Sequence, residues 1–314
     1  MSANEIADHL MPELEWLGGL DGLEGQEGQE GQEGLEFPWW QGPVCLVRMD
    51  KLPYGGGNKV PRMLAWLAQQ HWPNEIVAMS DAGSHTFLTL LHLLNSQEMG
   101  VTRLTLLSRG LPSSPYAQAI DQLINKHPRI TVIRGSSAAL WARLQMAKLM
   151  GGAVLPVGAA TPAGDVIHHQ IADYVVKQVA QHDRRQAIHL LPVSSGVMLA
   201  ALAQRSATID AQQSWHGLYT GTAPKVYYYY QKWLLQRQRR SVVLERGVRL
   251  TWGQVERLKL AFKQHTCAVI DPVHMAACLA WLEGPRKRVN SLEKNTTLVV
   301  WVTCPAALIP LTET

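Results

Sequence analysis

One lysine of the chain stands where it could perform covalent chemistry. Lys59 ends the segment LPYGGGNK (52–59) and opens a run with apolar residues at helical spacing. Glycines allow positive φ angles and a close approach of the backbone to a ligand. A helix N-terminus disfavours an ammonium ion, so we expect the pKa of Lys59 to fall. A lysine that forms a Schiff base needs such a neutral amine. The alternative on these residues is a turn followed by a solvated lysine.

Two further loops join a predicted strand to a predicted helix and carry hydroxyl groups. Ser84 and His85 stand at the first junction, where a helix N-terminus could bind a carboxylate or a ring oxygen. Ser194, Ser195 and Gly196 stand at the second, where backbone N–H groups and two hydroxyls could hold a phosphate. Ordinary helix capping is the alternative at both places.

The elements that must position these side chains alternate along the chain. Strands are predicted at 44–49, 75–80, 101–108, 129–135, 153–159, 187–194, 215–221 and 296–303, and helices at 60–70, 84–97, 115–127, 138–150, 166–182, 196–206, 225–238, 252–265 and 273–283. This alternation predicts parallel βαβ units, in which ligands bind beyond the carboxyl ends of the strands. His274 starts one helix and Thr303 ends the last strand, although each is a weak signal by itself.

Length and composition limit the class of protein. The 314 residues are 46% hydrophobic and 17% charged, which suits about two folded domains rather than a disordered chain. No apolar run is long enough to span a bilayer, and the first residues do not resemble a secretory signal. The four cysteines form no CxxC pair. We therefore expect a cytoplasmic protein with reduced cysteines, no membrane partner and no metal site.

The charge is distributed unevenly. Ten of the 25 acidic residues and none of the 29 basic ones lie in residues 1–36, which include the GQE repeat of 21–34. Glycine and repelling glutamates predict a flexible arm, with the ordered chain beginning near 35–40. The basic remainder, with a run of bases in 231–249, could bind nucleic acid, but such runs are more often solvated faces.

Taken together and in this order, the loops resemble one family. The chain is similar to fold-type-II pyridoxal-phosphate enzymes, in the branch of 1-aminocyclopropane-1-carboxylate deaminase and D-cysteine desulfhydrase. GGNKVPRMLAWL (56–67) is similar to the family's GGNK-x-RKLE-x-L, and IDPVHMAACLAWL (270–282) to its LDPVY-x-x-K-x-x-x-GL. VVWVTCPAAL (299–308) resembles the strand that ends in HTGG. The resemblance covers residues 44–310 and leaves out the acidic arm.

The resemblance implies roles for individual residues. Lys59 would form the Schiff base with pyridoxal 5'-phosphate, and Asn58 would support the cofactor pocket. Ser84 matches the serine of the family's SNH or SNQ motif, which helps with the substrate carboxylate and with proton transfer. His85 stands where the family has the asparagine that contacts the ring oxygen of the cofactor. Thr303 keeps the hydroxyl expected near the pyridine nitrogen.

Besides the replacement at His85, other positions of the family are changed or only partly kept, and the two glycines of HTGG have become Cys304 and Pro305. Ser194, Ser195 and Gly196 fall at the phosphate-binding position, in a loop with fewer glycines and hydroxyls than usual. His274 replaces the active-site tyrosine and is the candidate for a second acid–base group. These replacements indicate either a changed reaction or substrate, or a catalytically inactive protein that still binds the cofactor.

The fold that the resemblance implies is an α/β architecture like that of the tryptophan synthase β chain. It has two open twisted sheets with flanking helices, and the cofactor lies in the interdomain cleft. We expect an acidic arm at 1–36, a larger domain formed by 37–67 and 165–314, and a smaller inserted domain at 68–164. The family also suggests a homodimer.

The implied reaction is an elimination or deamination of a small amino acid, which gives an oxo acid and ammonia. A D-cysteine desulfhydrase or an aminocyclopropanecarboxylate deaminase would have this kind of activity. The alternative is a pseudoenzyme of the same fold that is altered or inactive. A nucleic-acid-binding or partner-binding protein is a more distant alternative.

Overall fold

The structure of the chain is a computed structural model, and by its internal contacts it divides into two compact units. It describes residues 9–17, 40, 42–96, 100–112, 115–183, 186–194, 196–209, 213–219, 242–246, 250–266, 275–283 and 296–303. Unit 1 comprises Met1–Met11, Asp50–Gln170 and Ala307–Thr314, and unit 2 comprises Pro12–Met49 and Ile171–Ala306. Residues 50–67, which we expected in the larger domain, belong to unit 1.

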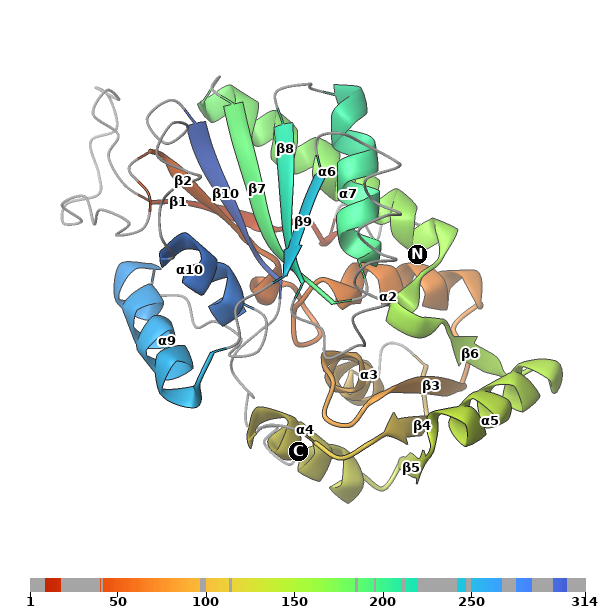
Figure 1. The fold of residues 1–314 in the computed structure, drawn as a ribbon. Helices are drawn as coiled ribbons and strands as arrows, with labels where there is room; N and C mark the ends of the chain where they lie inside the picture. Colours follow the sequence, from red (N-terminus) through yellow and green to blue (C-terminus); the bar gives the residue numbers. More distant parts are fainter. Residues whose placement is uncertain are drawn as a thin grey trace. The chain divides into compact units, whose positions relative to one another are not determined.

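Unit 1 is built on a four-stranded parallel sheet with the order β5-β4-β3-β6 (Figure 1). Its strands are β3 (Glu75–Asp81), β4 (Arg103–Arg109), β5 (Ile130–Gly135) and β6 (Ala153–Leu155). In the register of the central strand, Ile76 is the partner of both Leu104 and Ala153. Because all four strands are parallel, their carboxyl ends meet at one edge, where loops such as 82–84 begin.

The helices of unit 1 follow the strands as the apolar spacing predicts. They are α2 (Lys59–Gln69), α3 (His85–Asn95), α4 (Pro115–Lys126), α5 (Ser137–Leu149) and the first half of α6 (Pro162–His182), with short 3-10 turns η1 (Met49–Lys51) and η2 (Val157–Ala159). Helix α5 packs on all four strands, and its start is capped by Ser136, whose hydroxyl accepts a hydrogen bond from the Ala139 amide at 3.3 Å. Under α5, Met79 and Leu107 contribute to a small apolar cluster.

Unit 2 is built on a six-stranded sheet with the order β1-β2-β10-β7-β8-β9 (Figure 1). Its strands are β1 (Glu13–Leu17), β2 (Val44–Arg48), β7 (Gln186–Val193), β8 (Gln213–Tyr219), β9 (Val242–Arg246) and β10 (Thr296–Val302). All neighbouring pairs are parallel except β1 with β2. The remaining helices are the rest of α6, α7 (Val197–Ile209), α9 (Trp252–Thr266) and α10 (Met275–Glu283).

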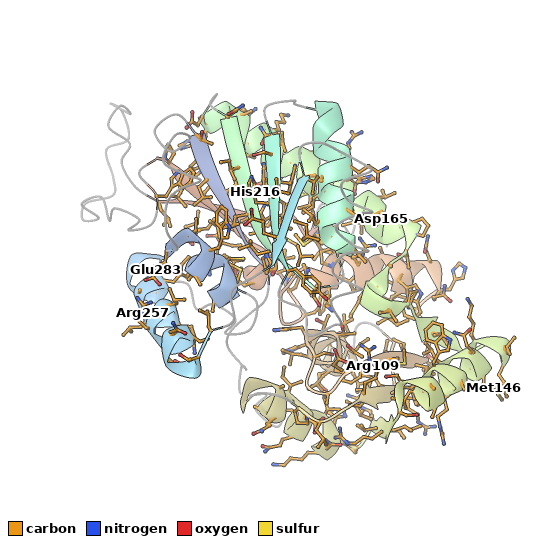
Figure 2. The ribbon with its side chains drawn as sticks, viewed as in Figure 1. Arg109, Met146, Asp165, His216, Arg257 and Glu283 are labelled. Atoms are coloured by element: carbon orange, nitrogen blue, oxygen red, sulfur yellow. The ribbon has the colours of Figure 1, made fainter. Side chains whose placement is uncertain are left out.

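The core of unit 2 follows the two-residue period of its strands. One face of the sheet packs against α9 and α10, in a cluster that includes Leu46, Leu190, Val300 and Phe262. The opposite face contains Trp301, and on this side α7 packs against β7 and β8. On the outside of unit 2, the side chains of α9 and α10 are joined by a salt bridge between Arg257 and Glu283 (Figure 2).

The strand at the edge of this sheet is a departure from the sequence prediction. Residues 13–17, placed in the arm ahead of the ordered chain, form β1 and pair along the whole of β2. Glu15 forms a salt bridge with Arg48, and Trp16 stacks on His182 with ring centroids 3.6 Å apart. These two consecutive side chains each contact a residue elsewhere in unit 2, and together with the pairing to β2 these contacts hold the segment as a strand.

Most other predicted elements are confirmed to within a few residues. The strand predicted at 153–159 ends early and turns into η2, where Ala159 has a positive φ of 53°. Strand β9 was not predicted, because its short apolar run VVL lies inside a basic segment. The predicted helix at 225–238 lies outside the described residues. Among the helices that the structure describes, none has the length and apolar character needed to cross a membrane.

Candidate active site

The turn that delivers Lys59 is shaped by its glycines. Gly55, Gly56 and Gly57 have φ angles of 82°, 69° and 97°. A Cβ at the first would lie 2.2 Å from the ring of His92, and at the second 2.1 Å from the carbonyl oxygen of Asp50. Neither the backbone conformation nor the space admits a larger residue. The loop therefore uses glycine to bring Lys59 to the first position of α2.

The amine of Lys59 is held by a hydroxyl of the next helix. Lys59 Nζ donates a hydrogen bond to Thr86 Oγ1 at 2.8 Å, and the Thr86 side chain is buried. Thr86 is the second residue of α3, which packs against α2. The lysine at the start of one helix is thus directed to the first turn of another.

A second hydroxyl at the start of α3 is buried without a partner. Ser84 is the N-cap residue, yet its side chain accepts no capping hydrogen bond, and Ser84 Oγ has no hydrogen-bond partner in the described structure. Gly83 before it has a φ of 67°, and a Cβ there would lie 2.1 Å from the Ala117 carbonyl oxygen. Buried hydroxyls are nearly always hydrogen-bonded, so an exception at a helix N-terminus is typical of a place that a polar ligand completes.

Two further predicted residues of unit 1 lie beside these groups. Asn58 is the N-cap residue of α2, and its own side chain makes no capping hydrogen bond either. His85 is the first residue of α3 and is half-buried between Ser84 and Thr86. Lys59, Ser84 and His85 are therefore brought together at the adjoining first turns of two helices.

The residues predicted in unit 2 share one edge of the larger sheet. Ser194 and Gly196 follow β7, and Thr303 follows β10, which is the parallel neighbour of β7. Gly196 has a φ of 77°, and its carbonyl accepts the Ala200 amide at 3.0 Å as α7 begins. Thr303 is buried and Ser194 is exposed. A helix N-terminus and a buried threonine thus lie at the carboxyl edge of this sheet.

Two predicted residues, Ser195 and His274, lie outside the described residues. Thr86 was part of the predicted helix start at 84–86, but it was not given a role of its own. The sequence signal was its hydroxyl, two positions after the N-cap residue Ser84. Within the described ranges no three His, Cys, Asp or Glu side chains are placed to hold a metal ion.

A buried histidine lies in the strands that lead to this edge. His189 on β7 stacks on Trp215 with ring centroids 4.1 Å apart, and its Nε2 lies 2.7 Å from Gln213 Oε1. Trp301 Nε1 donates to His189 Nδ1 at 3.1 Å. The Gln213 oxygen can only accept, so Nε2 carries the proton and the ring is neutral. Burial lowers the pKa of His189 to about 4.

Comparison with known proteins decides the fold. No protein-family model matches the chain, and no curated protein sequence matches it. Among solved structures, a homologue of ACC deaminase aligns over 83% of this chain and 84% of its own, with a TM-score of 0.64 and 17% identity. A threonine deaminase from T.th. aligns over 85% of this chain and 89% of its own, with a TM-score of 0.58 and 15% identity.

The chain has the fold of the type-II pyridoxal-phosphate enzymes. A hydrogen sulfide-producing enzyme from Fusobacterium nucleatum covers 96% of this chain and 98% of its own, with a TM-score of 0.60 and 10% identity. The predicted α/β class with two sheets and flanking helices is confirmed. At these identities the likeness concerns the fold, and a fold by itself does not define a reaction.

Proposed function

We propose that the chain is a pyridoxal-phosphate-dependent enzyme that eliminates from, or deaminates, a small amino acid, and that Lys59 is its cofactor lysine. The observation that carries the proposal is the Lys59 amine, held 2.8 Å from Thr86 Oγ1 at the start of α3 next to the unpartnered hydroxyl of Ser84. A lysine amine beside a helix N-terminus and an unsatisfied hydroxyl suits an anionic, aldehyde-bearing ligand.

Each unit, taken by itself, offers groups of the kinds that suit pyridoxal phosphate. Ser84 Oγ supplies a buried hydroxyl with unused hydrogen-bonding capacity. Gly196 precedes the first residue of α7, and a helix N-terminus is a place that favours a phosphate. Thr303 is a neutral buried hydroxyl suited to the pyridine nitrogen. When bound, pyridoxal phosphate supplies an electron sink for the substrate's α-carbon.

Each of these side chains would then have a defined task. Lys59 would hold the cofactor covalently and, once released by the incoming amino acid, would accept the proton from its α-carbon. Thr86 would direct the amine by accepting its hydrogen bond. Ser84 and the amides at the start of α3 would bind the substrate carboxylate. Because Thr303 is neutral, the pyridine nitrogen would stay largely unprotonated, which favours elimination over transamination.

The substrate class follows from the same groups. An α-amino acid carries the amine that exchanges with Lys59 and the carboxylate that the α3 N-terminus favours. D-cysteine and 1-aminocyclopropane-1-carboxylate are the candidates that the sequence resemblance suggests. With either, the products would be an oxo acid and ammonia.

The test is a visible absorption spectrum of the purified protein with pyridoxal phosphate. Wild type should develop a yellow band that borohydride bleaches, and peptide mapping after reduction should place the label on Lys59. Lys59→Ala should lack the band. Lys51→Ala is the matched control, because Lys51 is an exposed lysine eight positions earlier, and it should behave as wild type.

Amino acids are then screened for spectral changes and for release of ammonia, with sulfide measured for D-cysteine. Ammonia release that requires Lys59 supports the proposed reaction. A spectral change without turnover with any amino acid would instead identify an inactive cofactor-binding protein. A colourless wild type, or a Lys59→Ala protein with an undiminished band, would refute the proposal.

A further inference from the structure

A buried arginine lies one turn after Lys59 in the same helix. Arg62 is 2% exposed, although it belongs to α2 with apolar neighbours on both sides. Its Nε donates to the Ala159 carbonyl at 3.0 Å, and its Nη2 donates to Asp165 Oδ1 at 2.7 Å (Figure 2 labels Asp165). Its Nη1 lies 3.0 Å from His168 Nδ1. A guanidinium with this many partners is fixed in place.

The arginine determines which nitrogen of His168 carries the proton. A guanidinium can only donate, so Nδ1 accepts from Arg62 and the ring proton is on Nε2. Nε2 lies 3.3 Å from the carbonyl oxygen of Asn58 and therefore donates to it. Burial, and then the positive charge of Arg62, lower the pKa of His168 to about 3, so the ring stays neutral. The contacts thus run from Asp165 through Arg62 and His168 to the Asn58 carbonyl.

The Asn58 carbonyl belongs to the peptide group that joins Asn58 to Lys59. Before it, the three glycines of 55–57 contribute no side chain to fix the loop. Asn58 itself makes no side-chain cap. Any rotation of the Asn58–Lys59 peptide would swing the lysine side chain away from Thr86. A hydrogen bond to this carbonyl from a rigid helix opposes that rotation.

The start of α6 is shaped to let this contact form. Gly164 faces Arg62, and a Cβ there would lie 3.1 Å from Arg62 Nε and 3.1 Å from Thr161 Oγ1. The Thr161 hydroxyl in turn accepts the Gly164 amide at 3.0 Å. A Cβ at this position would be in tight contact with both atoms, so Arg62 and Thr161 would have to shift by a few tenths of an ångström to make room for it. The missing side chain at Gly164 therefore leaves the space in which the Arg62 guanidinium contacts His168.

We propose that His168 is a positioning residue for Lys59, acting through its Nε2–H hydrogen bond to the Asn58 carbonyl, with Arg62 and Asp165 holding the imidazole in the tautomer that can donate. The inference rests on the proposed role of Lys59, but its first test needs no cofactor. His168 contacts neither substrate nor cofactor in this proposal. It fixes the backbone from which the reactive amine extends.

The test compares two amides at position 168. The amide of asparagine occupies about the place of the ring Nδ1, so His168→Asn keeps an acceptor for Arg62 but does not reach Asn58. The amide of glutamine reaches the place of Nε2, so His168→Gln keeps a donor to the Asn58 carbonyl. Ile167→Ala is the control, because Ile167 is the buried neighbour on α6 and its truncation loosens the packing without removing the hydrogen bond.

The first readout is the rate at which acetic anhydride labels Lys59 in the cofactor-free protein, relative to the exposed Lys126, measured by peptide mass spectrometry. His168→Asn should raise the ratio about fivefold, the factor that corresponds to losing one hydrogen bond. His168→Gln and Ile167→Ala should leave it near the wild-type value. An unchanged ratio in His168→Asn, or an equal rise in Ile167→Ala, would overturn the proposal.

Two further measurements keep the inference separate from the proposed function. A long-range ¹H–¹⁵N spectrum of the wild-type protein should show His168 protonated at Nε2 and not at Nδ1, and the opposite tautomer would overturn the proposal even if no variant folds. With pyridoxal phosphate, His168→Asn should form the borohydride-sensitive band more slowly than His168→Gln. If wild type forms no band, the proposed function fails while the labelling result still decides the role of His168.

Discussion

His189 should make the stability of unit 2 depend on pH in a defined window. Its ring is neutral in the folded protein, because Trp301 donates to Nδ1 and Gln213 accepts from Nε2. An added proton at Nδ1 would face the indole N–H with no acceptor. The folded pKa of about 4 lies below the ordinary value of 6.5. The unfolded chain therefore binds a proton below pH 6.5, whereas the folded chain binds it only near pH 4.

Stability is consequently lost as the pH falls through this window, and above pH 6.5 the contribution of His189 is fully present. Each pH unit inside the window costs at most about 1.4 kcal/mol for one group. Between pH 6 and pH 4.5 the unfolding free energy should fall by about 2 kcal/mol because of His189 alone. Other titrating groups add their own dependence, so the quantity to compare is the difference between wild type and a variant.

The assay is urea unfolding followed by tryptophan fluorescence at several pH values between 4.5 and 7. His189→Gln removes the titration and should flatten the dependence by about 2 kcal/mol over that range. Ile188→Val, next to it on β7, is the control: it lowers stability by a similar amount at every pH and leaves the slope unchanged. Equal slopes in wild type and His189→Gln, or a His189 pKa near 6.5 by NMR, would refute the reasoning.

Three substitutions test other contacts. Gly83→Ala should destabilise the protein by about 2 kcal/mol or more in urea, because the new Cβ would meet the Ala117 carbonyl at a positive φ; an unchanged midpoint would contradict the geometry. Thr297→Val should cost about 1–3 kcal/mol, since it removes a 2.7 Å hydrogen bond to Asp183, and a fully stable variant would speak against that contact. Arg62→Met removes the donor to the buried Ala159 carbonyl and to the Asp165 carboxylate, and should lower the unfolding free energy by about 3–5 kcal/mol. The loss should be seen as faster hydrogen exchange of the α2 amides. Exchange as slow as in wild type would contradict the prediction.

The sequence predicted those parts of the fold that depend on local periodicity. Apolar spacing located α2 and α3, and the glycines before Lys59 correctly placed the lysine at a helix start. The loops after β7 and β10 were expected at the carboxyl edge of a parallel sheet, and Gly196 and Thr303 lie there. These predictions succeed because the pattern of buried and exposed positions of each element is present in its own sequence.

Features that depend on long-range pairing were not predictable in the same way. The bases around β9 concealed three apolar residues whose burial depends on β8 as a neighbour. In the sequence, His168 and His169 are only adjacent helix positions that cannot easily share a metal. The role of His168 depends on Arg62, 106 positions away in the chain. No local pattern connects the two, although an arginine inside an otherwise apolar helix face was a sign that a buried partner exists.

The antiparallel strand β1 covers an edge of the larger sheet that could otherwise pair with another molecule. Its partner β2 is buried at all five positions, and residues 13–17 pair with it along its whole length on that side. In a protein cut within the GQE repeat, β1 would stay in place only through noncovalent contacts, which are its pairing with β2, the Glu15–Arg48 salt bridge and the stacking of Trp16 on His182. If β1 left, β2 would become an apolar sheet edge that could pair with the same edge of another molecule. By covering β2, strand β1 therefore protects the sheet against edge-to-edge aggregation. A truncated form of the protein should keep residues 13–17.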